Sequence, residues 1–198
     1  ALIGTAMGTA LLPTLSKSVA KKDNQNTSDN YNNAVLIVLL LTIPAAFALF
    51  SISQNIIEVL FERGEFDSLS TAAAAFALQA LALGLPAFGL IKVFASCFFA
   101  MKDTKTPVKA AMLALIVNLI LNISLVIIFQ KIGIMPHVGL ALATSIAAWV
   151  NFFYLFIKLK NNDGFYFSQN FKNSIIKIIF ASIIMTIFLF IFKNYELN

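Results

Sequence analysis

Five long apolar segments dominate this chain of 198 residues and decide what it can fold into. The hydrocarbon core of a bilayer is about 30 Å thick, and a helix needs about 20 apolar residues to cross it. The segments that meet this requirement are 34–57, 71–101, 108–129, 138–157 and 174–192. The chain is 60% hydrophobic and only 12% charged, whereas soluble domains are typically about 25% charged. The sequence therefore predicts an all-α membrane protein, a polytopic transmembrane helical bundle.

Residues 1–12 are also apolar, but twelve residues of helix are only about 18 Å long. We expect them to form the second half of a sixth crossing, so the chain has about five full crossings plus one partial one. Gly4 and Gly8 have the spacing that lets two membrane helices approach closely, although ordinary small-residue packing gives the same pattern. No basic segment or small-residue cleavage site marks a removable signal peptide.

The basic residues are distributed unevenly over the predicted loops. If loop 16–33 is cytoplasmic, the inner loops and flanks hold ten of them and the outer ones three. The inner set is Lys17, Lys21, Lys22, Lys102, Lys105, Lys109, Lys158, Lys160, Lys172 and Lys177, and the outer set is Arg63, Lys131 and Lys193. Because cytoplasmic loops carry an excess of lysine and arginine, this orientation is favoured. The net charge of +5 is then a topological signal with some attraction to anionic lipids, and no nucleic-acid partner is expected.

Segment 71–101 is too long for a straight crossing and carries helix-breaking residues in its middle. As one helix its 31 residues would measure about 46 Å. Pro86 has no backbone N–H, and its ring disturbs the carbonyl of Ala82. We expect a break or hinge at Gly84, Pro86 and Gly89, with a smaller kink at Pro44 in the preceding crossing.

Lys92 is the only charged residue between Asp67 and Lys102. A lysine near the bilayer centre costs about 2.5–3.5 kcal/mol on insertion scales. It lies nine residues from Met101, about 14 Å along a helix, which is too deep for easy snorkelling. A mid-membrane charge beside a mid-membrane break is typical of a transporter site. The alternatives are that the Lys92 side chain extends to the membrane interface, or that it pairs with a carboxylate on a neighbouring helix.

Two further crossings carry polar side chains. Asn118 and Asn122 are four residues apart and share a helix face, and Thr144 and Asn151 lie on the next crossing. These groups either form hydrogen bonds between helices or hold a cation, because amide and hydroxyl oxygens suit hard cations. A cation site would need a carboxylate from elsewhere. Trp149 is deeper than an interfacial position, and we expect it to pack.

The residue types that enzymatic chemistry needs are scarce. Cys97 and His137 are each the only residue of their type, so neither a metal cluster nor a nucleophile with its base can be assembled. No phosphate-binding loop pattern is present. The sequence predicts a protein that is not an enzyme and has no metal or cofactor.

Three segments carry a specific resemblance to a known family. They are 8–17 (GTALLPTLSK), 59–66 (VLFERGEF) and 82–108, which begins ALGLPAF, continues through Lys92 and ends FAMKDTKTPV. In order and spacing they resemble the MurJ (MviN) family of bacterial lipid II flippases. That family belongs to a superfamily that also contains drug/cation exporters and polysaccharide flippases.

The resemblance implies a transporter of two six-helix lobes around a central cavity. Residues 1–160 resemble part of the second lobe, and 161–198 resemble a cytoplasmic loop with one additional C-terminal helix. The implied function is to move lipid II, a peptidoglycan precursor for the cell wall, from the inner to the outer leaflet of the cytoplasmic (inner) membrane by alternating access. Lys92 matches a lysine that faces the cavity, so it is the expected contact for the substrate's pyrophosphate.

The resemblance also implies partners that this chain does not contain, chiefly an N-terminal lobe, in addition to lipid II and membrane lipids. We therefore expect the chain not to transport alone. The alternatives are another exporter of the superfamily, for a drug or an undecaprenyl-linked polysaccharide, and an inactive remnant of a split gene. The driving ion, the exact substrate and the oligomeric state are left open by the sequence.

Overall fold

The computed structural model describes residues 13, 24–133, 135–161 and 169–195, and all regular secondary structure among them is helical. The helices are α2 (Asn24–Phe61), α3 (Ser68–Ala82), α4 (Leu85–Ala100), α5 (Lys105–Lys131), α6 (Pro136–Lys160) and α7 (Gln169–Tyr195). Five stretches are long and apolar enough to cross a membrane: Ser28–Phe61, Ser68–Ala100, Lys105–Lys131, Pro136–Lys160 and Phe171–Ile191. The five predicted full crossings are confirmed, and the partial crossing predicted at 1–12 lies outside the described residues.

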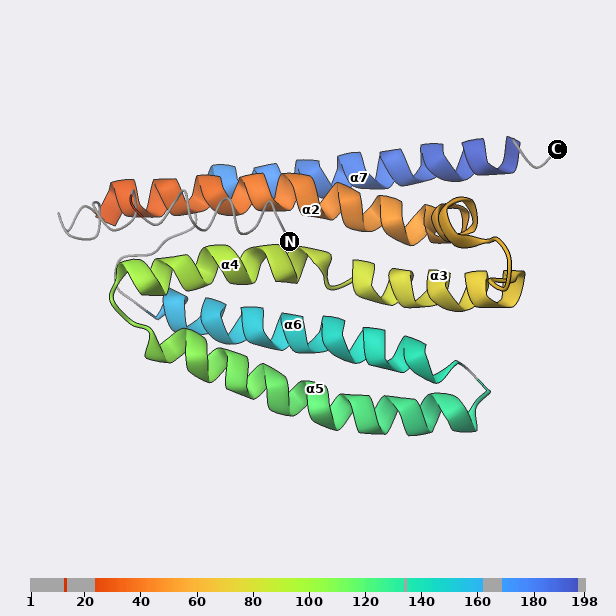
Figure 1. The fold of residues 1–198 in the computed structure, drawn as a ribbon. Helices are drawn as coiled ribbons and strands as arrows, with labels where there is room; N and C mark the ends of the chain where they lie inside the picture. The colour runs from red at the N-terminus through yellow and green to blue at the C-terminus, as the bar shows by residue number, and fades with distance from the viewer. Residues whose placement is uncertain (1–12, 14–23, 134, 162–168, 196–198) are drawn as a thin grey trace.

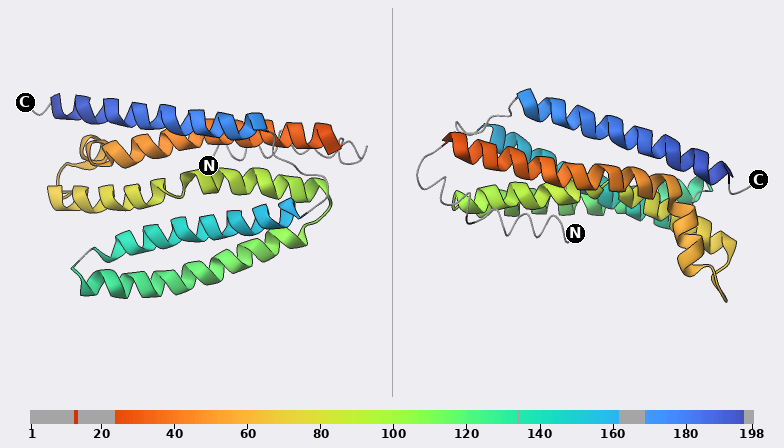
Figure 2. Two further views of the ribbon diagram at one scale, coloured as in Figure 1. Left: turned by 180° about the vertical axis from the view of Figure 1, so that it is seen from behind. Right: turned by 90° about the horizontal axis from the view of Figure 1, so that it is seen from above.

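The helices lie roughly parallel to one another, with α3 and α4 end to end in the middle of the bundle (Figure 1). Helix α2 packs against α3, α4 and α7, and α6 packs against α3, α4 and α5. The view from above in Figure 2 places α7 behind α2, on the side away from the viewer of Figure 1. The broken crossing is therefore central, with α2 on one side and α6 on the other.

An aromatic cluster fills the space between α2, α4 and α6. Phe94 on α4 is 1% exposed and makes edge-to-face contacts with Tyr31 on α2 and Phe152 on α6, each with ring centroids 5.1 Å apart. Such contacts add about 0.5–1.5 kcal/mol to the burial of the rings themselves. Val38 and Leu155 complete the buried side of the cluster. This core fixes α4 between its two neighbours.

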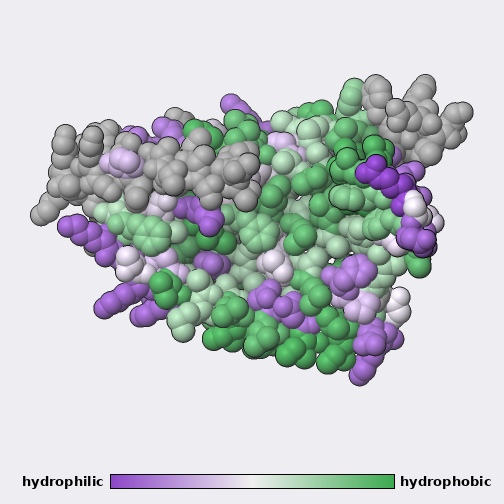
Figure 3. All heavy atoms as spheres, in the orientation of Figure 1, coloured by the Kyte–Doolittle hydropathy of each residue, from purple (hydrophilic) through white to green (hydrophobic). Residues whose placement is uncertain are grey.

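Small residues allow close approach in the antiparallel α5–α6 pair. A Cβ atom on Gly139 would stand 3.1 Å from the backbone carbonyl carbon of Leu125, and Ala110, Ala114, Ala143 and Ala147 are all buried. This is the usual way in which membrane helices pack. The outer faces are apolar: α5 exposes Leu115 and Leu119, and much of the visible surface over α5 in Figure 3 is hydrophobic.

A tight turn connects α4 to α5. Lys102 has a φ of +60°, and the N–H groups of Asp103 and Lys102 donate to the carbonyls of Phe98 (2.9 Å) and Phe99 (3.0 Å). This is the Schellman pattern that ends many helices. The Asp103 carboxylate accepts hydrogen bonds from the N–H groups of Lys105 and Thr106 and from the Thr106 hydroxyl. One aspartate thus supports the start of α5, which accounts physically for the polar run that follows α4.

Candidate functional site

The predicted break in the second crossing is present and lies at Leu83 and Gly84, between α3 and α4. Pro86 occupies the first turn of α4, where a missing N–H costs least. The N–H of Gly84 donates to Leu81, three residues back, so the carbonyl of Ala80 loses its usual helical partner. The break therefore creates polar backbone groups in the middle of an apolar crossing.

Side chains of α6 bind these backbone groups. The Ser145 hydroxyl donates to the Ala80 carbonyl at 2.6 Å, and the Trp149 indole N–H donates to the Leu83 carbonyl at 2.9 Å. A carbonyl without a partner in a membrane interior costs several kcal/mol, so these bonds allow the break to exist. Trp149 was expected to pack, and it does contact Phe152 and Phe153, but the sequence did not reveal its hydrogen bond.

Gly84 lies where α6 approaches the break most closely. A Cβ atom at this position would stand 2.7 Å from the Ser145 hydroxyl oxygen and 2.9 Å from the Ser145 Cα. Gly89, one turn into α4, similarly faces α2, where a Cβ would stand 2.6 Å from a methyl group of Val38. Both glycines of the predicted hinge are thus sites of close helix approach, and the role of Gly84, Pro86 and Gly89 in motion remains a prediction.

A second irregularity lies in α2. Ile52 has non-helical backbone angles (φ −114°, ψ 21°), eight residues beyond the proline at which we expected a smaller kink. The amide of Gln79 on α3 donates to the Phe50 carbonyl at 3.2 Å. Nearer the start of α3, the Ala73 carbonyl oxygen lies 3.0 Å from His137 Nε2 on α6. Helix α3 is therefore joined to both neighbours by side-chain hydrogen bonds.

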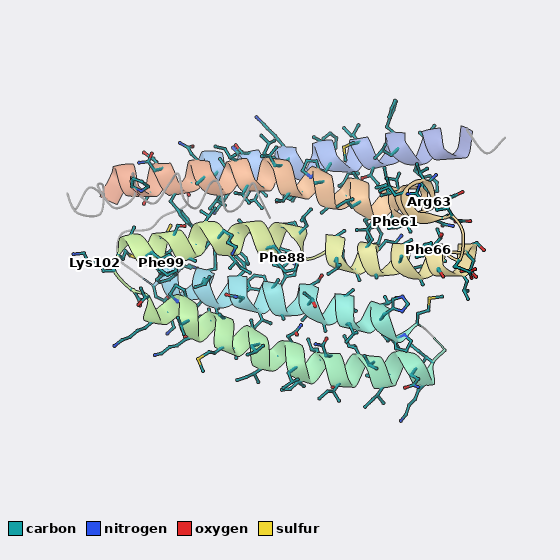
Figure 4. All side chains as sticks on the ribbon, viewed as in Figure 1. Phe61, Arg63, Phe66, Phe88, Phe99 and Lys102 are labelled. Carbon is teal, nitrogen blue, oxygen red and sulfur yellow. The ribbon has the colours of Figure 1, made fainter. Side chains whose placement is uncertain are left out.

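Lys92 lies on the face of α4 that points away from the aromatic core. Leu90 and Phe94 are 4% and 1% exposed and share the core face, whereas Lys92, midway between them, is exposed. It shares its face with Phe88 and Phe99, which Figure 4 labels near the two ends of α4. Among the described residues no ion pair of Lys92 is formed. The carboxylate pairing considered as an alternative is thus not found in this part of the chain.

The polar residues of α5 and α6 are brought to neighbouring levels. Gly139 lies against Leu125, and the helices run antiparallel, so Thr144 is level with a point between Asn118 and Asn122. The Asn122 amide N–H donates to the Asn118 side-chain oxygen at 3.0 Å. The Thr144 hydroxyl instead donates to the carbonyl of Leu140, on its own helix.

On α5 and α6, two side-chain amide oxygens at different levels of the helix pair are buried without a hydrogen-bond partner. They belong to Asn122 on α5 and to Asn151 on α6. A buried polar atom of this kind calls for an explanation, because leaving it unpaired costs about 1–3 kcal/mol. No group of three or more His, Cys, Asp and Glu side chains is found among the described residues, and α5 and α6 contain no Asp or Glu, so these two helices could offer a cation only neutral oxygens.

A multi-pass helical bundle with a broken central crossing, and with an exposed lysine on that crossing, is an arrangement typical of membrane transporters. The model of the family "Lipid II flippase MurJ" matches residues 1–197. The chain belongs to the MurJ family.

Similar proteins agree with this assignment. A probable lipid II flippase MurJ of Rickettsia prowazekii is 36% identical over 197 residues, which is 100% of this chain and 38% of that protein. The lipid II flippase MurJ of Burkholderia cenocepacia is 32% identical over 93% of this chain and 35% of its own length. A solved structure, lipid II flippase MurJ in an inward closed conformation, superposes with a TM-score of 0.76 at 29% identity, over 96% of this chain and 38% of that one. This chain therefore spans somewhat over a third of the length of these relatives.

Proposed function

We propose that this chain forms part of a lipid II flippase of the bacterial cytoplasmic membrane. The observation that supports the proposal is the match of the MurJ family model to residues 1–197. The flippase would carry the lipid-linked peptidoglycan precursor from the inner to the outer leaflet by alternating access, with loop 16–33 on the cytoplasmic side. This chain covers 38% of the Rickettsia prowazekii relative, and the first lobe that the family resemblance implies would act together with it.

Lys92 is the residue to which we assign the substrate headgroup. It is exposed on the face of α4 opposite the core, and the described residues offer it no carboxylate. An ammonium in an apolar surrounding gains most from an anionic ligand, and a pyrophosphate supplies several acceptor oxygens to a point charge. The break at Leu83 and Gly84 would let α3 change its angle to α4 and thereby open or close the path beside Lys92.

A chimera tests this proposal directly. The part of the Rickettsia prowazekii relative that matches this chain is replaced by residues 1–197, and the chimera is expressed in cells depleted of their own lipid II flippase. We expect the chimera to restore growth and lipid II translocation, and the chain alone to restore neither. Absence of rescue by a chimera that reaches the membrane at normal level would contradict the proposal.

Lys92→Ala in the chimera is expected to abolish rescue without lowering the amount in the membrane. Lys109→Ala, at the start of α5 and exposed, is the matched loss of one positive charge and should leave rescue intact. Normal growth of the Lys92→Ala chimera would remove the headgroup role while leaving the flippase assignment standing.

The alternatives predict other results. An exporter of another substrate would confer drug resistance or polysaccharide export without restoring lipid II translocation. An inactive remnant would be preceded by a stop codon in the DNA upstream of Ala1, whereas an in-frame first lobe favours the flippase.

A cation site at Asn118, Asn122 and Thr144 is the second function we propose. The buried and unpaired amide oxygen of Asn122 favours it. Neutral oxygens suit Na⁺ better than a divalent ion, which generally requires carboxylates. Binding of ²²Na⁺ to the chimera should fall on Asn122→Ala and persist in Ser124→Ala, which removes a hydroxyl bonded within α5. Unchanged binding in the Asn122 variant would refute the site.

A further inference from the structure

A pocket lies on the opposite side of α4 from Lys92. Its volume is about 310 Å³, within the range of roughly 300–1,000 Å³ that is usual for ligand pockets. It is lined by Val35, Leu39, Leu90, Phe94, Phe152, Phe156, Phe171, Lys172 and Ile175. These residues come from α2, α4, α6 and α7, and Lys172 is the only polar residue among them.

The pocket forms because two helices that border it do not pack together. Helix α7 packs on α2, and α6 packs on α3, α4 and α5, but α6 and α7 have no extended contact with each other. The space between them is lined by the rings of Phe152 and Phe156 on one side and by Phe171 and Ile175 on the other. In a membrane, such a slot is accessible to lipid chains rather than to water.

The geometry of α4 separates this pocket from the proposed substrate path. Leu90 and Phe94 line the pocket and are four residues apart, so they share a helix face. Lys92 lies two residues from each and therefore points to the opposite side of the helix. A ligand in the slot would not reach the lysine that we assign to the substrate headgroup.

Two described residues at the mouth of the pocket carry a positive charge. Lys172 lies in the first turn of α7, close to the cytoplasmic surface in the orientation that the lysine distribution favours. Lys160 is four residues beyond Phe156, which places it on the same face of α6, and it is exposed. Basic pockets between membrane helices on the cytoplasmic side are suited to anionic lipid headgroups.

We propose that this slot binds an anionic phospholipid of the inner leaflet. One acyl chain lies among the phenylalanine rings between α6 and α7, and the headgroup phosphate contacts Lys172. The lipid fills a gap that the described side chains leave between α7 and α6, and so couples these two helices. The site is independent of the proposed flippase substrate and would remain if that proposal failed.

Trp149 provides a reporter for this site. It is the only tryptophan of the chain, and its ring centroid is 5.6 Å from that of Phe152, which lines the pocket. Bromine atoms on a lipid acyl chain quench tryptophan fluorescence at short range. The full chain is reconstituted into phosphatidylcholine vesicles that contain a small fraction of brominated phosphatidylglycerol or, in parallel, brominated phosphatidylcholine with the same acyl chains.

We expect phosphatidylglycerol to quench Trp149 at about one fifth of the mole fraction that phosphatidylcholine requires. This preference corresponds to roughly 1 kcal/mol, the typical contribution of one lysine near a membrane surface. Lys172→Gln should reduce the preference to near unity. Lys177→Gln is the matched control, because it removes the same charge from α7 at a position that does not line the pocket, and it should leave the preference intact.

Three outcomes would overturn the proposal. Equal quenching by the two lipids would mean that the slot does not select a headgroup. A preference that Lys172→Gln and Lys177→Gln weaken equally would reflect general attraction of the basic surface to anionic lipid. Relief of quenching by undecaprenyl phosphate at a lower mole fraction than unbrominated phosphatidylglycerol would assign the slot to the carrier lipid instead.

Discussion

Gly84→Ala tests whether the break depends on close approach between Gly84 and α6. The added Cβ would stand 2.9 Å from the Cα of Ser145, whereas carbon atoms in favourable contact are about 3.5–4.0 Å apart. Because the obstacle is backbone, no rotamer change relieves it, and α6 must move away by roughly 0.6–1.1 Å. That movement also stretches the bonds from Ser145 to Ala80 and from Trp149 to Leu83.

The cost follows from these terms. Overpacking of this kind typically destabilises by about 1–3 kcal/mol, and each weakened hydrogen bond adds about 0.5–1.5 kcal/mol. Gly84 has helical backbone angles (φ −85°, ψ −13°), which alanine also adopts. Alanine lowers the conformational entropy of the unfolded chain, and this offsets about 0.4–1 kcal/mol of the destabilisation. The terms sum to about 1–5 kcal/mol, so we expect a net destabilisation of about 3 kcal/mol, or a melting temperature lower by roughly 6–12 °C in detergent micelles.

Double substitutions provide the control. Gly89→Ala also creates a short contact, but its nearest partner is a methyl group of Val38, at 2.6 Å, followed by the Thr42 methyl group at 3.2 Å. Val38→Ala leaves a cavity in the parent core that the new methyl group would partly fill, so it should cost less stability in the Gly89→Ala background than in the parent. Ser145→Ala should restore little in the Gly84→Ala background, because the Cα of residue 145 remains. A Gly84→Ala chain that melts like the parent, or one that Ser145→Ala fully rescues, would refute this account of the break.

Two other predictions concern single hydrogen-bonded groups. Trp149→Phe keeps an aromatic ring but removes the donor to the Leu83 carbonyl, and should lower the unfolding free energy by about 0.5–1.5 kcal/mol in a denaturant titration. Phe153→Leu, which loses two ring contacts but no hydrogen bond, should cost less in the same titration. Hydrogen bonds from the Thr106 side chain and backbone lower the pKa of Asp103, so its stabilising effect is present above the unfolded-state pKa of about 3.9 and is lost as the pH falls through the lower folded-state value. Asp103→Asn should therefore flatten the dependence of stability on pH below about pH 5, and an unchanged slope would contradict this.

The five crossings could be predicted from the sequence because a bilayer requires long apolar runs whatever the tertiary structure. The break could be predicted as well, because Pro86 lacks a backbone N–H and Gly84 lacks a side chain. The kink at Ile52 could not, because no proline or glycine marks it. It is tolerated because the amide of Gln79, on another helix, binds the Phe50 carbonyl.

The side chains that form hydrogen bonds with the break could not be predicted from the sequence. Ser145 and Trp149 are more than sixty residues from the carbonyls that they bind, and nothing local distinguishes them from ordinary packing residues. The sequence directed attention to Thr144 and Asn151 instead, whose roles remain predictions. A serine and a tryptophan four residues apart on a helix rich in small residues are the signal that could have been used, because they place two donors on one face.

The two halves of the broken crossing are held by different forces. Helix α4 is fixed by the aromatic core around Phe94, whose removal would expose a large buried surface. Helix α3 has smaller buried residues, mainly alanines, and is joined to its neighbours through Gln79 and through His137, Ser145 and Trp149. Side-chain hydrogen bonds in membranes contribute on average only about 0.6 kcal/mol each and can be exchanged one at a time. We therefore predict that the half that carries Lys92 is held more firmly, so that a change of angle at Gly84 would displace α3.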